Sequence, residues 1–200
     1  MKSKELAWKI RRHGIEMTHL SGGSHIGAVL SVADIVATLY TDVMKYDPKN
    51  PDWSERDRFI LSKGHAGASI YAAIAESGFF DTEELKTHYA DGSRLSGHVS
   101  HHLPGIDFST GSLGHGLPVG AGMAYADKKS GNERRTFVVL GDGECNEGSV
   151  WEAALFANTA SAVTVRVRVC PPKRPATCSR TNSTSLNRCE VRCPGWSTWL

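Results

Sequence analysis

An aspartate between two glycines is the feature of this sequence whose residue types best suit chemistry. Gly141-Asp142-Gly143 follows a β-branched and apolar run at 136–140 and precedes a run of helix formers at 144–157. The carboxylate therefore lies at a strand-to-helix corner, which is where ligands bind in open α/β sheets. The glycines let a ligand approach the backbone, the N–H groups that open a helix suit an anion, and the carboxylate suits Mg²⁺ or Ca²⁺. The motif favours a metal diphosphate, and the alternative is an ordinary glycine turn with a solvated aspartate.

Three histidines in loop-like stretches form a second chemical signal. His25, His65 and His98 each lie one or two residues after a glycine. Because imidazole titrates near neutral pH, such a set could move protons on the hydroxyl groups of a substrate. Each histidine taken alone could also be a solvated or a packing residue. His98, His101 and His102 could also ligate zinc, but no further Cys or His lies at ligand spacing, which disfavours a zinc site.

Bulk composition narrows the class of protein. The chain has 200 residues and a net charge of +2, and no apolar run approaches the length of about 18 residues needed to span a bilayer. From residue 161 onward seven Lys or Arg stand against one Glu, whereas residues 1–160 carry 16 basic and 20 acidic residues. An acidic body gives no electrostatic reason to expect nucleic-acid binding. We therefore expect neither a nucleic-acid nor a membrane partner, and the single Cys145 before residue 161 indicates a reducing, cytoplasmic location.

Hydrophobic periodicity predicts the elements that position these side chains. It predicts helices at 5–20, 31–44, 68–77, 114–126 and 144–157 and strands at 58–62 and 136–140, with Met17 and Trp151 in the core. Strands that alternate with helices imply a parallel sheet covered by helices on both faces, so the predicted fold class is α/β. The stretch 90–117 is rich in glycine and largely irregular, which is typical of an ordered ligand loop.

Four motifs in a fixed order carry a resemblance to a known family. They are Gly23-Ser24-His25, Ser62-Lys63-Gly64-His65-Ala66, Gly97-His98 with Thr110-Gly111-Ser112-Leu113-Gly114, and the stretch 141–153 that begins Gly-Asp-Gly-Glu. Together they resemble the N-terminal, diphosphate-binding part of transketolase. Residues 46–67 and the compact start are similar to the separate N-terminal subunit of bacterial split transketolases. The resemblance covers roughly residues 5–158, nearly four-fifths of the chain.

The resemblance implies a cofactor, a metal and a set of site residues. Thiamine diphosphate and Mg²⁺ are the implied cofactors, with Asp142 as the metal ligand. The cofactor-binding residues that it implies are His65, Gly111, Ser112, Leu113, Gly141, Asp142 and Gly143. The catalytic residues that it implies are His25, His65 and His98, which would contact the cofactor and sugar hydroxyls, and Glu147, which would lie at the subunit interface.

The implied reaction transfers a two-carbon ketol unit from a ketose phosphate to an aldose phosphate, with the thiazolium ring as electron sink. The implied partner is a separate C-terminal, pyrimidine-binding subunit in an α2β2 assembly. Two other classes stay open: a non-catalytic truncated fragment, and another thiamine-diphosphate enzyme, namely a 2-oxo acid dehydrogenase α-subunit or deoxyxylulose phosphate synthase. Trp151-Glu152-Ala153 and Ser62-Lys63-Gly64-His65 favour transketolase over both.

The chain departs from the family pattern after residue 158. In thiamine-diphosphate enzymes an asparagine roughly 30 residues after Gly-Asp-Gly is the second protein ligand of the metal, yet no asparagine lies between Asn158 and Asn182. A metal held by Asp142 alone predicts weak cofactor binding, and the loss of the expected elements predicts an unstable product. A strand is possible at 162–169, but Pro171 and Pro172 prevent its continuation into a metal loop.

The composition also changes abruptly, because the sequence from 159 is rich in Arg, Ser, Thr, Cys and Pro. We interpret 1–158 as the thiamine-diphosphate-binding domain and 159–200 as an aberrant or disordered tail. A frameshift is our hypothesis for its origin, and a divergent tail or a zinc ribbon are the alternatives. Four cysteines without a Cys-x-x-Cys pair, Cys170, Cys178, Cys189 and Cys193, disfavour zinc.

Overall fold

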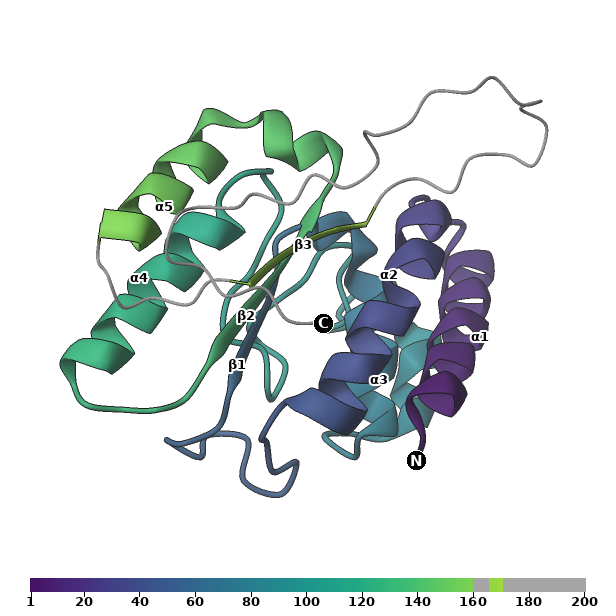
Figure 1. The fold of residues 1–200 in the computed structure, drawn as a ribbon. Coiled ribbons are helices and arrows are strands. Elements are labelled where there is room, and N and C mark those ends of the chain that lie inside the picture. Colours follow the sequence, from purple (N-terminus) through teal and green to yellow (C-terminus); the bar gives the residue numbers. More distant parts are fainter. Residues whose placement is uncertain (160–165, 171–200) are drawn as a thin grey trace, which may run out of the picture.

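The computed structural model describes residues 1–159 and 166–170, and it arranges them as a parallel sheet between helices (Figure 1). The helices are α1 (Ser3–Ser21), α2 (Ile26–Thr38), α3 (Gly67–Glu76), α4 (Gly116–Lys129) and α5 (Gly148–Thr159). Short helical turns lie at η1 (Leu39–Val43), η2 (Gly64–Ala66), η3 (Thr82–Thr87) and η4 (Gly143–Asn146). The strands are β1 (Arg58–Leu61), β2 (Thr136–Gly141) and β3 (Arg166–Cys170), in the order β1-β2-β3 with both pairs parallel. This confirms the α/β fold class.

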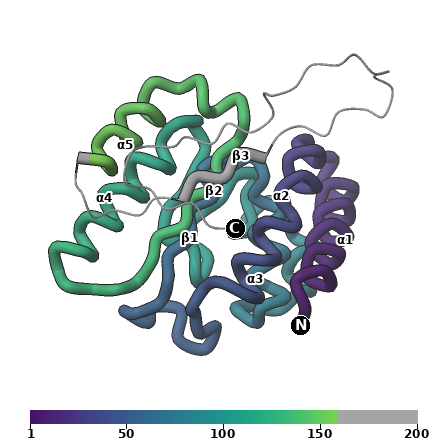
Figure 2. Tube along the Cα trace, in the orientation of Figure 1, coloured from purple at the N-terminus to yellow at the C-terminus, as the bar shows by residue number. Residues whose placement is uncertain are grey.

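Helices cover the two faces of the sheet in separate groups: α1, α2 and α3 lie on one side and α4 and α5 on the other (Figure 1, Figure 2). Alternate residues of a strand point to opposite faces, and the burial of β1 and β2 follows that rule. Phe59 and Leu61 pack in the core cluster with α1, α2 and α3, whereas Ile60 and Val138 pack with α4 and α5. Both faces of β1 and β2 are largely apolar because helices cover both faces of these strands.

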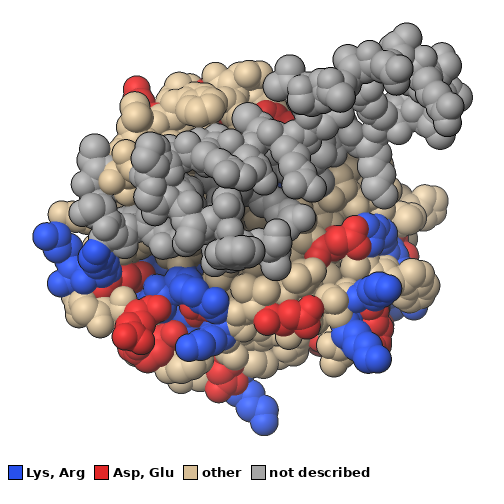
Figure 3. Space-filling model, viewed as in Figure 1, with Lys and Arg blue, Asp and Glu red and all other residues tan. Residues whose placement is uncertain are grey.

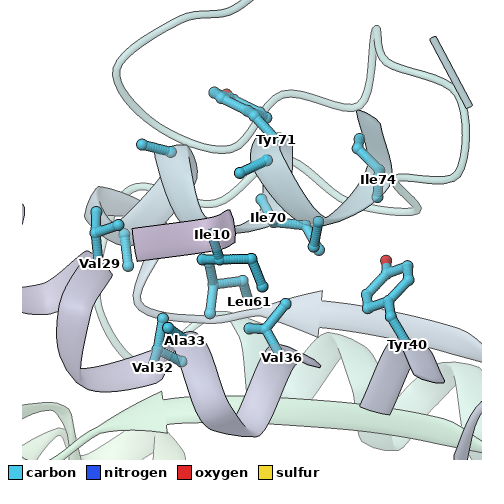
Figure 4. Packing of buried hydrophobic residues seen from close by; sticks show 14 of the residues in the cluster. Ile10, Val29, Val32, Ala33, Val36, Tyr40, Leu61, Ile70, Tyr71 and Ile74 are labelled. Carbon is cyan, nitrogen blue, oxygen red and sulfur yellow. The ribbon is translucent and has the colours of Figure 1, made fainter. Parts of the chain in front are cut away.

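The larger core forms where α1, α2 and α3 meet β1 (Figure 4). Ile10 of α1, Val36 of α2, Leu61 of β1 and Ile70 of α3 are each nearly or fully buried there. Burying one such side chain stabilises the fold by about 1.5–3 kcal/mol, so this cluster is a main source of the stability of the domain. It anchors α2 and the loop after β1, and these elements carry His25 and His65.

Helix α4 approaches the second face of the sheet closely, as its glycine and alanine content predicts. A Cβ added at Gly120 would lie 2.5 Å from Val138 Cγ2. Real Cβ contacts are not that short, so glycine is what allows the helix to sit on β2. The helix leads directly out of the loop at 110–115, so its close packing also fixes the end of that loop.

Several details differ from the prediction. Helix α5 begins at Gly148 rather than at 144, because the short turn η4 occupies Gly143–Asn146. Helix α2 begins at Ile26 rather than at 31, because its first turn follows His25 directly. Trp151 is 46% exposed rather than in the core, since Val150 and Ala154 supply the buried face of α5 and the Trp151 indole donates to the Cys145 carbonyl at 2.9 Å. Met17 is buried, as predicted.

The helix that runs through α2 and η1 has a bilayer-like composition. Ile26–Val43 has 18 residues and a mean hydropathy of 1.6, enough by length and composition to cross a membrane. A core helix of a globular domain meets the same criteria. Residues of α2 such as Val32 and Val36 are fully buried against α1 and α3, as in a core helix.

Strand β3 overlaps the second half of the possible strand at 162–169 and ends one residue later, at Cys170. It pairs parallel with β2 from Phe137↔Arg166 to Gly141↔Cys170. The domain boundary at 158 stays a prediction, because 160–165 and 171–200 lie outside the described residues. The hypotheses of a frameshift, of a disordered tail and of a zinc ribbon, and the effect of Pro171 and Pro172, also fall outside them.

Charges of both signs are mixed on the visible part of the face drawn in Figure 3. The described residues form several ion pairs, for example Arg135 with the buried Asp57 at 2.5 Å and Arg94 with Glu84 at 2.5 Å. Arg135 and the backbone N–H of Lys45 hold the pKa of the Asp57 carboxyl below its usual value against the opposing effect of burial. The first pair joins the residue before β2 to the residue before β1, and the second joins the stretch that leads to His98 to η3.

Candidate functional site

The carboxyl ends of β1 and β2 bring two of the predicted motifs side by side. Leu61 pairs with Val139, and the Ser62 N–H donates to the Val139 carbonyl at 2.9 Å. Ser62-Lys63-Gly64-His65 therefore leaves the sheet next to Gly141-Asp142-Gly143. Ligands of open α/β sheets bind at this edge, so the fold places both motifs where a ligand would sit.

The structure gathers the three predicted histidines into one cluster. The ring centroid of His25 lies 5.1 Å from that of His65 and 6.1 Å from that of His98. His25 and His98 are exposed, and His65 is half-buried. Residues from three separate loops thus present imidazoles to one space, which the sequence motifs alone do not require.

Each imidazole has a local structural cause for its position. His25 precedes α2 with φ of 69°, a left-handed conformation that turns the chain sharply into the helix. His65 lies in the short turn η2 directly after β1. The backbone carbonyl of His98 accepts hydrogen bonds from Tyr71 Oη at 2.5 Å and Ser96 Oγ at 2.7 Å.

The electrostatics of the cluster favour a neutral His65. Burial lowers the pKa of the His65 imidazole below its ordinary value, and the positive charge of Lys63 lowers it further. The neighbouring imidazoles act in the same direction, while Glu144 opposes them. A neutral imidazole at physiological pH can accept a proton, as a general base must.

Lys63 is a site residue for which the sequence motif gave no role. Its side chain is 4% exposed, and its ammonium contacts Ser31 Oγ at 3.5 Å. Among the described residues no carboxylate forms an ion pair with Lys63, and its Cβ lies 3.8 Å from the position of a Cβ added at Gly141. A buried ammonium without an opposite charge is costly, so this position suits an anionic ligand.

The loop that carries Gly111, Ser112 and Leu113 is held against the turn of His65. The Val99 N–H donates to the Gly64 carbonyl at 3.2 Å, and the Thr110 hydroxyl donates to the Leu61 carbonyl at 2.7 Å. A Cβ at Gly64 would overlap the Thr110 carbonyl oxygen, so only glycine permits this approach.

Two predicted cofactor-binding glycines have no structural need to be glycine. A Cβ added at Gly111 or Gly143 would meet no heavy atom of the described residues within 4 Å, and neither residue has a positive φ. Neither turn geometry nor packing explains the missing side chain. Open space at both backbones fits the close approach of a ligand, and with Lys63 it fits a diphosphate.

The residues of the site fit a metal ion less completely than they fit a diphosphate. Asp142 is exposed, and among residues 1–159 its carboxylate makes no hydrogen bond or ion pair, so its oxygens are available to a cation. The described residues contain no group of three or more His, Cys, Asp or Glu that could hold a metal ion. The site thus offers one carboxylate ligand.

The predicted interface residue Glu147 is exposed, and a Cβ added at Gly114 would lie 2.8 Å from its Cβ.

Glu144 is a second residue that the sequence did not single out. Its side chain is 1% exposed, and its carboxylate accepts hydrogen bonds from Ser62 Oγ, from the Gly114 N–H at 2.9 Å and from the Gly141 N–H at 2.9 Å. The signal in the sequence is only its position directly after Gly-Asp-Gly. A glutamate at that place indicates only the start of a helix. Its burial could not be predicted from the sequence, because burial of a charge depends on the tertiary fold.

Comparison with known proteins agrees with this geometry. Residues 2–163 match the family model "Transketolase, thiamine diphosphate binding domain". One of the subunits of the apulose-4-phosphate transketolase of Actinobacillus succinogenes is 48% identical over 136 residues, which is 68% of this chain and 49% of that protein. One of the subunits of the 6-deoxy-6-sulfo-D-fructose transketolase of a Clostridium species is 44% identical over 149 residues, which is 74% of this chain and 54% of that protein.

Solved structures give the same result. The transketolase of Leishmania mexicana superposes with a TM-score of 0.73 at 30% identity, covering 84% of this chain and 27% of that one. The transketolase of Campylobacter jejuni superposes with a TM-score of 0.75 at 30% identity, covering 82% and 28%. The chain spans about half the length of the curated relatives that it matches. With its fold, its motifs and its sequence in agreement, the chain belongs to the transketolase family, and residues 2–163 correspond to the thiamine diphosphate binding domain of that family.

Proposed function

We propose that this chain is the diphosphate-binding subunit of a two-chain transketolase. The reaction is transfer of a two-carbon ketol unit from a ketose phosphate to an aldose phosphate, with thiamine diphosphate and Mg²⁺. The observation that carries the proposal is a buried Lys63 that forms no ion pair with any residue the structure describes, beside Gly-Asp-Gly and near a cluster of three imidazoles. Such a place suits an anionic cofactor and proton transfer together.

The cofactor-binding roles follow from charge and space. Lys63 supplies a positive charge for the diphosphate, and Gly111 and Gly143 let the cofactor approach the backbone. Asp142 supplies a carboxylate oxygen to Mg²⁺, and Ser112 and Leu113 complete the loop on the pyrimidine side. When bound, thiamine diphosphate supplies the electron sink that ketol transfer needs.

The histidines have roles in handling protons and sugar hydroxyls. His65, kept neutral by burial and by Lys63, accepts a proton from a substrate hydroxyl and returns it to the product. His25 and His98 are exposed at the same space and orient sugar hydroxyls by hydrogen bonds. Their loops come from different parts of the chain, so the substrate channel needs the whole domain to be folded.

A partner chain completes the site. Support comes from relatives that are named as subunits of transketolases. We propose that a C-terminal, pyrimidine-binding subunit docks beside the exposed Glu147 and that the assembly is α2β2. The enzyme would work on sugar phosphates of the pentose phosphate type in the cytoplasm, where Cys145 would stay reduced.

The single carboxylate ligand sets the expected affinity. Mg²⁺ prefers oxygen ligands, and Asp142 would supply one carboxylate oxygen to it, whereas no asparagine between Asn158 and Asn182 could supply a second. We therefore expect this chain to bind thiamine diphosphate about tenfold or more weakly than a site that holds the metal by both ligands, because one amide oxygen ligand is missing.

The test is titration of the purified chain with Mg²⁺ and thiamine diphosphate, followed by nuclear magnetic resonance, which also detects weak binding. The expected result is saturable shifts at His65, Gly111 and Gly143, reduced by Asp142→Ala, with ketol transfer measurable only after a C-terminal subunit is added. A folded chain that shows no shifts at any concentration would favour the non-catalytic fragment instead. Micromolar binding with turnover would show that another residue replaces the missing metal ligand.

A further inference from the structure

Glu144 is a buried carboxylate to which the proposed chemistry assigns no role. It is 1% exposed and lies in η4, the short turn between β2 and α5. Removing a carboxylate from water costs several kcal/mol unless hydrogen bonds replace those lost to solvent. The hydrogen-bond partners of Glu144 therefore show which segments of the chain this carboxylate holds together.

All hydrogen-bond partners of Glu144 in the described structure are donors. Two of them come from other loops, and one comes from the end of β2, just before the turn that carries Glu144. Ser62 Oγ and the Gly114 N–H donate to Oε1, and the Gly141 N–H donates to Oε2. Ser62 Oγ in turn accepts from the Gly116 N–H at 3.1 Å. An ionised carboxylate, which only accepts hydrogen bonds, suits this set of donors.

Each bonded residue adjoins a residue of the proposed site. Ser62 precedes Lys63, Gly114 follows Leu113, and Gly141 precedes Asp142. One carboxylate therefore joins the loop after β1, the loop before α4 and the loop after β2. These loops lie far apart in the sequence, and the hydrogen bonds to Glu144 span up to 82 positions.

We propose that Glu144 is a positioning residue that sets the spacing of the three loops that hold the cofactor diphosphate. What the loops hold rests on the proposed function, whereas the hydrogen bonds themselves do not. Its two oxygens fix two backbone N–H groups and one hydroxyl at once. Protein donors occupy both oxygens, so Glu144 acts through Lys63, Asp142 and the 111–113 loop.

The carboxylate is specific for this task. In Glu144→Gln one acceptor oxygen becomes an N–H₂ donor, which would face the N–H of Gly114 or Gly141 and break that bond. Aspartate is one methylene shorter and cannot reach both loops. Ser62→Ala is a gentler variant, because it removes one donor to Glu144 and leaves the Gly116 N–H unpaired.

The test compares the full chain with its Glu144→Gln and Ser62→Ala variants, with Glu133→Gln as an exposed control. Amide exchange is measured without ligand. We expect about tenfold faster exchange at Gly114 and Gly141 in Glu144→Gln, faster exchange at Gly116 in Ser62→Ala, and wild-type rates at Val138 of β2 in both. Should Glu144→Gln fail to fold, Ser62→Ala carries the test.

A second readout separates positioning from simple stabilisation. Titration with Mg²⁺ and inorganic diphosphate is expected to give about tenfold weaker binding in Glu144→Gln, with a smaller loss in Ser62→Ala and none in Glu133→Gln. Unchanged exchange, or faster exchange with unchanged binding, would overturn the proposal. If the wild-type chain binds no diphosphate, the proposed function fails. The positioning role is then read from Ser62→Ala, which keeps the Glu144 charge that acts on His65. Imidazole chemical shifts of His65 that stay fixed in Ser62→Ala would overturn the positioning role, and shifts that move together with faster exchange at Gly116 would support it.

Discussion

At the scale of single residues, we expect replacement of Lys63 to raise the stability of the unliganded chain and to lower its affinity for diphosphate. Replacing it by Met removes a buried ammonium, so we expect the free energy of unfolding of the unliganded chain to rise by about 1–3 kcal/mol. Diphosphate affinity should fall about 10- to 100-fold, because a charge-assisted contact is lost. Urea unfolding and diphosphate titration measure the two effects.

The control for this prediction is Lys128→Met, which removes an exposed ammonium at the end of α4. It should leave both quantities near the wild-type values. A lower stability in Lys63→Met would mean that the ammonium has a stabilising partner in the folded chain, and diphosphate would then not be its counter-charge.

His65 gives the chain a predictable response to acid. Burial, and then Lys63, lower the pKa of its imidazole in the folded state, and burial also lowers the pKa of His88. As the pH falls below about 6.5 the unfolded chain takes up protons first, so stability is full above that pH and decreases below it. We expect His65→Asn to lose less stability than the wild type between about pH 7.5 and about pH 5.5.

Urea unfolding at the two pH values measures this difference. The exposed His19→Asn serves as the control and should keep the wild-type loss. An equal loss in His65→Asn and the wild type would show that the imidazole titrates alike in the folded and unfolded chains.

Residue types and spacing were enough to single out loops that the structure brings together, but not to predict which charges are buried among them. The histidines at 25, 65 and 98 could be singled out from the sequence because each follows a glycine by one or two residues and imidazole titrates near neutral pH. Burial of Lys63 and Glu144 could not be predicted in the same way. Charged residues are usually exposed, and only the pairing of β1 with β2 brings these two under other loops.

At the scale of elements, α4 offers two glycines with opposite expected effects. Gly120→Ala would place a Cβ 2.5 Å from Val138 Cγ2, so overpacking should destabilise the chain by about 1–3 kcal/mol. Gly122→Ala meets nothing within 4 Å, so higher helix propensity should stabilise it by about 0.5–1 kcal/mol. Urea unfolding of both variants measures this; a loss at Gly122 or a gain at Gly120 would mean that α4 sits farther from the sheet.

Element types were predictable from periodicity, and their ends were less so. Strand β2 and helices α1 and α3 lie within one or two residues of the predicted ranges. The start of α2 was missed because His25 adopts a left-handed conformation that sequence patterns rarely signal. Trp151 was misplaced because helical spacing alone does not say which face of α5 meets α4.

At the scale of the whole molecule, β3 makes the 158 boundary testable. A chain that ends at Thr159 loses the ladder that pairs β2 with β3 and leaves one edge of β2 unpaired in the described sheet. We expect it to unfold at lower urea, with a loss of about 2 kcal/mol or more, and to self-associate in sedimentation. Equal stability and a monomeric truncated chain would show that the domain ends at 158 as predicted from composition.

The register of the sheet also has a consequence for how the chain is made. Strand β1 pairs with β2 in parallel, with Arg58 opposite Thr136, so the pair cannot form until the later strand has been synthesised. At about 5–20 residues per second, that wait is roughly 4–16 s. Over this interval a nascent chain carries an apolar strand whose edges have no partner among the described strands. A chaperone acting during translation would meet its target when 58–61 has emerged and 136–141 is still inside the ribosome.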